Sequence, residues 1–148
     1  MILIRVTNTR DFTALARRLR HASKESRQEL YKAINRATRP AKQAVRLSAT
    51  ERLPHRGGLN KRVASSKIVT RRRMSGKYAG IRIVGTSGYD IGSINRGRVR
   101  HLTFGHLPWS NQAVKPGFWT EPLVALRPEI RRELDEAVTR IGKQIERG

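Results

Sequence analysis

Two apolar stripes at helical spacing constrain the fold of this chain more than any other feature of its sequence. The first runs from Leu30 to about Leu53, and its members recur every three or four residues. That spacing gathers side chains on one face of a helix. Ser23 can cap this helix, and Glu25 suits the positive end of its dipole. Because the stripe resumes in phase after Pro40, we predict one kinked helix from about 23 to 53.

The second stripe lies near the carboxyl end of the chain and predicts a terminal helix that packs on the rest of the fold. Thr120 is a candidate N-cap, and Pro128 suggests a jog or a second start. The apolar positions of this stripe are Ile130, Leu134, Ala137, Val138, Ile141 and Ile145. A shorter helix is expected at 12–22, capped by Asp11.

Alternating and β-branched runs predict the strands. Residues 2–7 alternate as a strand does, and 67–74 and 77–85 read as a hairpin joined at Ser75–Gly76. A proline and two glycines in "LPHRGGLN" indicate a loop, and "LNKRVASS" indicates one or two helical turns.

Residues 86–118 are rich in glycine and contain two prolines, so a long irregular loop is expected there, with a short strand near 99–104. The order of elements predicts an α+β fold. In it, a small antiparallel sheet is packed by a long kinked N-terminal helix region and a C-terminal helix. We expect residues 1–148 to form a single domain.

The composition adds a lean core and a strong positive charge. Only 37% of the residues are apolar, and the formal net charge is +21. Residues 52–119 hold 14 Lys and Arg residues against the single acid Asp90. Because such a chain repels itself, we expect a polyanion or an acidic partner to neutralise it. The absence of cysteine excludes disulfide scaffolds and thiol chemistry, and no apolar run reaches the ~20 residues of a membrane span.

The stretch "INRGRVRHLTFGH" (94–106) suggests two kinds of chemistry. Its histidines, His101 and His106, could belong to a metal or nuclease site together with Asp90 and Asn111. A zinc site needs three or four ligands, and a metal-dependent nuclease needs several carboxylates. Because the region has one acid, we interpret the histidines as ordinary loop residues, and we expect no catalytic, cofactor-binding or metal-binding residue.

The arginines of the middle region suggest a nucleic-acid surface. In an extended chain, alternate residues point to the same side, so Arg96, Arg98 and Arg100 could track phosphates without reading base sequence. Three consecutive arginines, Arg71, Arg72 and Arg73, lie on the predicted hairpin. A solvated edge strand, protected from aggregation by its charge, is the alternative interpretation. The scarcity of aromatic residues argues against sequence-specific or base-stacking recognition.

Four aromatic residues are candidates for an assembly interface: Phe104, Trp109, Phe118 and Trp119. The adjacent pair in "QAVKPGFWTEP" stands between a Pro-Gly turn and a helix start. Large amphipathic rings there suit contact with a neighbouring subunit, but a buried aromatic pair could equally be core.

In their order, these motifs resemble those of the tail-completion (neck, minor tail) proteins of long-tailed bacteriophages, which lie at the head–tail junction. The resemblance covers nearly the whole chain and depends on the order of several degenerate motifs. These are "LARRLRHASKESRQELYKAINRATRPAKQAVR", "LPHRGGLNKRVASSKIVTRR", "YAGIRIVG", "INRGRVRHLTFGH", "VKPGFWTEPL" and "RPEIRRELDEAVTRI".

The resemblance implies a structural virion protein, assembled in the host cytoplasm, without enzymatic activity or a cofactor. It would form a homo-oligomeric ring, usually of six copies, with genomic DNA crossing the lumen by non-specific contact. Its partners would be head-closure or connector proteins and the tail terminator or tail-tube proteins. It would not bind a membrane. A tail terminator role and a free, non-sequence-specific basic DNA-binding protein are the alternatives. The electrostatic residues would be the six arginines at 71–73, 96, 98 and 100.

Overall fold

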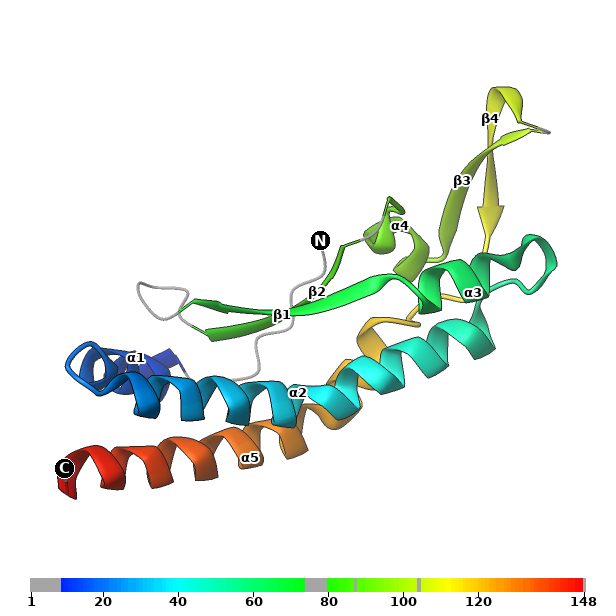
Figure 1. The fold of residues 1–148 in the computed structure, drawn as a ribbon. Coiled ribbons are helices and arrows are strands. Elements are labelled where there is room, and N and C mark those ends of the chain that lie inside the picture. The colour runs from blue at the N-terminus through cyan, green and yellow to red at the C-terminus, as the bar shows by residue number, and fades with distance from the viewer. Residues whose placement is uncertain (1–8, 74–79, 87, 104, 148) are drawn as a thin grey trace. The chain divides into compact units, whose positions relative to one another are not determined.

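A computed structural model describes residues 9–73, 80–86, 88–103 and 105–147 of the chain (Figure 1). The helices are α1 (Thr9–Leu19), α2 (Lys24–Arg52), α3 (Leu59–Ala64), α4 (Ile91–Asn95) and α5 (Thr120–Arg147), with a 3-10 turn, η1, at Arg56–Gly58. The strands are β1 (Lys67–Arg73), β2 (Gly80–Thr86), β3 (Arg98–Thr103) and β4 (His106–Ala113). None of the helices in these ranges is both long and apolar enough to cross a membrane.

The predicted α+β class is confirmed. Two long helices, α2 and α5, pack together with two small antiparallel sheets, β1–β2 and β3–β4. The prediction had one sheet, whereas the strands form two separate pairs. The strand predicted at residues 2–7 lies outside the described residues.

Contacts within the chain divide it into two compact units, through which α2, β1, β2 and α5 all run. Among the described residues, the helical unit comprises 9–40, 70–73, 80–83 and 125–147. The arm unit comprises Ala41–Val69 and Val84–Val124.

The core of the helical unit follows the two predicted stripes. Buried side chains come from α1, from the first half of α2, from β2 and from α5; they include Leu19, Leu30, Ile34, Ala37, Ile81, Ile83, Ile130, Leu134 and Ile141. Thr38 is buried in this core, and its hydroxyl bonds to the Ile34 carbonyl at 2.9 Å and to the Thr70 hydroxyl at 3.0 Å. Thr38 therefore ties α2 to β1 without leaving a polar atom unpaired.

The core of the arm unit gathers around two aromatic rings. The buried side chains here are Val45 and Ala49 of α2, Leu53 just after it, Val63 of α3, Val84 of β2, Ile91 and Ile94 of α4, and Phe118, Trp119 and Leu123. Alanine and valine dominate the α2 face, which lets neighbouring elements approach the helix closely. The lean composition is thus sufficient for a packed core in each unit.

Helix α2 continues through Pro40, as the uninterrupted stripe predicted. Proline removes the hydrogen bond that the carbonyl of Arg36 would otherwise accept. Both Pro40 and Arg36 are exposed, so water can satisfy that carbonyl. Ser23 also acts as predicted, since its hydroxyl accepts the Ser26 N–H at 3.2 Å.

The prediction of a long irregular loop at 86–118 is wrong. This segment contains α4 and the β3–β4 hairpin, of which only a short strand near 99–104 was foreseen. Strand β4 carries proline, asparagine and glutamine and is exposed along nearly its whole length. A strand without a buried face has no apolar alternation, and therefore no periodic signal to detect.

Candidate functional site

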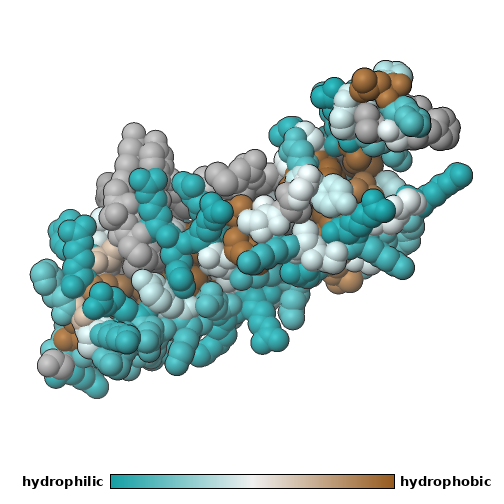
Figure 2. All heavy atoms as spheres, turned by 45° about the horizontal axis from the view of Figure 1, so that its top comes forward, coloured by the Kyte–Doolittle hydropathy of each residue, from teal (hydrophilic) through white to brown (hydrophobic). Residues whose placement is uncertain are grey.

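A projecting β-hairpin in the arm unit, here called the arm (residues 98–113), is the strongest candidate for a functional surface. Figure 1 shows β3 and β4 extending beyond α4 and α3 of the same unit. Every residue of β4 except Ser110 is exposed. Leu107 is 76% exposed and Trp109 is 48% exposed. Figure 2 accordingly shows apolar and polar spheres together at the outer end of the arm.

Helix α4 carries the chain into the arm and is capped at both ends. The Asp90 carboxylate accepts the Ser93 hydroxyl at 2.7 Å and the Ser93 backbone N–H at 3.0 Å. These two hydrogen bonds, the hydroxyl first, lower the pKa of the Asp90 carboxyl below its ordinary value. At the other end, Gly97 takes φ +90°, a left-handed conformation that glycine adopts readily. The spacing of Asp90, Ser93 and Gly97 is a helix start-and-stop signal that the sequence does contain.

Asn95, the last residue of α4, joins that helix to the start of α5. Its side-chain oxygen accepts the backbone N–H groups of Trp119 at 2.9 Å and Thr120 at 3.1 Å. Its own carbonyl accepts the Gly117 N–H at 2.8 Å. The amino end of α5, which was expected to be capped by Thr120 alone, is thus capped by a buried residue 25 positions earlier. No local pattern could have revealed this role.

Two of the predicted assembly residues are core residues instead. Phe118 and Trp119 are 0% and 1% exposed, and their rings meet edge to face with centroids 6.2 Å apart. The Trp119 ring also packs so tightly on Gly85 that a β-carbon there would lie 3.0 Å from it. With their side chains enclosed by their own chain, these residues leave no ring surface for a neighbour. The Pro-Gly turn and the hydrogen bonds that the Trp119 and Thr120 N–H groups donate to Asn95 hold the backbone that directs both rings inward.

Of the other two predicted assembly residues, Phe104 lies outside the described residues and Trp109 lies on the arm. Trp109 is on β4, opposite Leu102 in the antiparallel register. The Arg100 guanidinium lies over the Trp109 ring, 4.9 Å from its centroid, as in a cation–π contact. Trp109 is therefore the one predicted assembly residue for which the described structure supplies an accessible ring.

The predicted row of three arginines is correct for two of its members. Arg98 and Arg100 lie two residues apart on β3 and so share one face of the ribbon with Asn111, which pairs with Arg100 in the register. Arg96 precedes the Gly97 turn and caps α4 instead. Its guanidinium donates to the Ser93 hydroxyl at 3.0 Å. The turn, which the alternation of letters conceals, removes Arg96 from the row.

Arg71, Arg72 and Arg73 are exposed at the end of β1, in the helical unit. The Arg72 guanidinium lies 4.0 Å from the centroid of the Tyr31 ring on α2. Successive residues of a strand point to opposite faces, so Arg71 and Arg73 point away from this contact. The three consecutive arginines therefore do not form one cationic row.

The histidines of the arm do not come together as a site. His101 pairs with Ser110 and His106 pairs with Thr103 in the register, and the nearby acid, Asp90, is engaged in capping α4. Within residues 9–73, 80–86, 88–103 and 105–147, no group of three or more His, Asp or Glu side chains could hold a metal ion.

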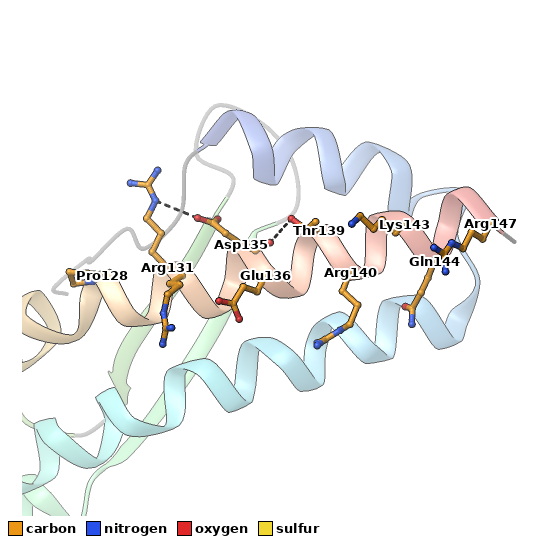
Figure 3. A pocket seen from close by; sticks show the side chains of 10 residues that line it. Pro128, Arg131, Asp135, Glu136, Thr139, Arg140, Lys143, Gln144 and Arg147 are labelled. Carbon is orange, nitrogen blue, oxygen red and sulfur yellow. Dashed lines mark hydrogen bonds and ion pairs between the residues drawn. The ribbon is translucent and has the colours of Figure 1, made fainter.

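A groove of about 910 Å³ runs along the exposed side of α5 in the helical unit (Figure 3). Five cations and two acids line it along a single helix, together with Pro128, Thr139 and Gln144. Arg131 and Asp135 pair across one turn at 3.8 Å. This mixed-charge face includes none of the predicted site residues, and its exposed ion pairs add little stability.

Comparisons with known proteins identify no relative of this chain. No family model matches it, and neither the curated proteins nor the solved structures give a match.

Proposed function

We propose that this chain is a structural virion protein that forms a ring at the head–tail interface of a siphophage. There it would complete the tail and join it to the head, while genomic DNA passes through the lumen. The neighbours would be head-closure or connector proteins on one side and tail terminator or tail-tube proteins on the other.

The observation that carries this proposal is the arm. A two-stranded ribbon exposed on both faces gains little stability from its own chain, and exposed apolar residues such as Leu107 and Trp109 are typical of surfaces that bind a partner. A ring subunit completes such a surface against its neighbours or its cargo. The order of motifs along the chain supports the same assignment by resemblance.

Assembly in solution and in the particle tests the proposal. Mass photometry and negative-stain microscopy of the purified protein should find a closed ring, with six copies expected. Deleting the gene from the phage should leave filled heads and finished tails that do not join. A protein that stays monomeric at micromolar concentration, together with normal particles after gene deletion, would contradict the ring assignment.

A second candidate function follows from the charge of the arm. A free basic protein that coats or condenses DNA would also need an exposed cationic ribbon. It would be a monomer or dimer, and its DNA affinity would fall steeply with salt. The two candidates therefore differ in stoichiometry, which the same mass photometry measures.

A further inference from the structure

The arm has two exposed faces whose side chains are mostly hydrogen-bond donors. One face carries Arg98, Arg100, Asn111 and the Trp109 ring, and the other carries His101 and Gln112. Residues 91–120, which include the arm and both of its connections, contain four Lys and Arg residues and no Asp or Glu. A surface of this kind complements an anionic partner.

The arginines of the arm lack carboxylate partners in the described part of the chain. Arg98 has no ion pair there, and the contact that holds Arg100 is the Trp109 ring. Their positive charges are therefore not neutralised within the chain and remain available for an external anion. Arg100 is also held in place by the ring, which reduces the rotamer entropy it would lose on binding.

A hollow of about 440 Å³ lies at the base of the arm. The residues that line it are basic, amide-bearing or small, and none is acidic: Arg96, Gly97, Arg98, Asn111, Gln112 and Ala113. A concave surface with donors and no carboxylate suits an oxyanion such as a phosphate.

Duplex DNA fits these observations better than an acidic protein does. The major groove is wide enough to admit a two-stranded β-ribbon, and phosphates border the groove on both sides. A stable protein interface would instead need an apolar core on one face, whereas this ribbon carries polar residues on both faces, and Arg100 and Asn111 share a face with Trp109. The scarcity of exposed aromatic residues favours backbone contact over stacking on single strands.

We propose that the arm is a DNA-contacting element, which seats in a groove of passing duplex DNA and holds phosphates through Arg98 and Arg100. The choice of duplex DNA as the anion rests on the proposed function. Contact through charge alone is independent of base sequence, so DNA can slide past the arm.

A titration with a 24-base-pair duplex of mixed sequence tests the proposal. The fluorescence anisotropy of the labelled duplex measures affinity, and acrylamide quenching of tryptophan fluorescence reports on the arm itself. Trp119 is buried and Trp109 is half exposed, so a change in quenching reports on the arm. DNA should protect Trp109, and the protection should vanish in Trp109→Phe.

In R98Q/R100Q, the slope of log affinity against log salt should fall by about 2, because two phosphate contacts are lost. The loss of affinity between 50 and 200 mM salt should then shrink about tenfold.

R36Q/R39Q is the matched control, since it removes two exposed arginines from α2 in the other unit. This variant should keep the protection of Trp109 and most of the salt slope. Equal effects of the two double variants, or quenching that DNA leaves unchanged, would overturn the proposal. So would equal protection of Trp109 by polyglutamate at the same concentration of charge, because the arm would then bind acidic polypeptide as well as DNA.

Mass photometry of the same variants separates this inference from the proposed function. If R98Q/R100Q forms the ring and loses the arm-dependent DNA contact, both the ring assignment and the DNA-contacting role of the arm are supported. If the wild-type ring forms but DNA leaves Trp109 unprotected, the role of the arm is wrong and the ring assignment survives. If DNA protects Trp109 of a protein that never forms a ring, the arm binds DNA and the proposed function is wrong.

Discussion

The two tryptophans of this chain stand ten residues apart and have opposite surroundings. Trp119 is enclosed between β2, α4 and Phe118, while Trp109 lies on a ribbon with both faces exposed. Both belong to the same acid-free stretch of sequence. The difference teaches that composition alone cannot distinguish the residues that stabilise the unit, such as Trp119, from the exposed residues of the arm, such as Trp109. Backbone turns and one buried asparagine make that separation.

Replacing each tryptophan by alanine is the most direct way to break this comparison. Trp119→Ala should lower the free energy of unfolding by about 3–5 kcal/mol, because it empties a packed site. Trp109→Ala should change it by no more than about 0.5 kcal/mol, because the ring is half exposed. Urea denaturation followed by circular dichroism measures both values. Similar losses in the two variants would show that the arm packs on the protein after all.

Two asparagines test the same comparison between the buried support and the exposed arm, with a smaller expected change in the free energy of unfolding. Asn95→Ala leaves the buried N–H groups at the start of α5 without an acceptor, and should cost about 1–3 kcal/mol of unfolding free energy. Asn111→Ala on the exposed face of β4 is the control, with an expected change within about 0.5 kcal/mol. The same denaturation experiment applies. A neutral Asn95→Ala would mean that α5 needs no cap from α4.

The smallest expected effect concerns pH and the entry to the arm. The pKa of Asp90 is lowered in the folded state by its hydrogen bonds from Ser93, so the stabilisation it provides is present above the ordinary carboxyl pKa of about 3.9 and is lost as pH falls through the lower folded value. Ser93→Ala should raise the Asp90 pKa toward the ordinary value, as an NMR titration of the carboxyl carbon would detect. An unchanged pKa in that variant would assign the shift to another group. Because Asp90 is exposed, only a slight change in acid stability should accompany it.

The two long helices were predictable from the sequence, whereas α4 and β4 were not. Helices α2 and α5 each bury one face, so their stripes could be read, and α2 could be followed through Pro40. Strand β4 has no buried face and gave no signal. Arg98 and Arg100 were correctly placed together because alternation is a local property. Arg96 was misplaced because the Gly97 turn was overlooked, and the Asp90 to Ser93 cap was overlooked with it.

The role of the aromatic pair shows where sequence reasoning ends. The letters "FWTEP" are equally compatible with an interface anchor and with a core. The outcome depends on Gly85 and Asn95, which are far from the pair in sequence and close to it in space. Such contacts belong to the tertiary structure, and no pattern within a short window encodes them.

One hydrogen bond at the base of the arm has a consequence for how this protein could change over evolution. The Val114 N–H donates to the Gly97 carbonyl at 3.0 Å, so the chain leaves the arm at the point where it enters it. Insertions, deletions or a complete exchange between these two residues would leave both attachment points in place. The arm is in this sense a module: its length and chemistry can vary, while Asn95, Phe118 and Trp119 keep the supporting unit unchanged.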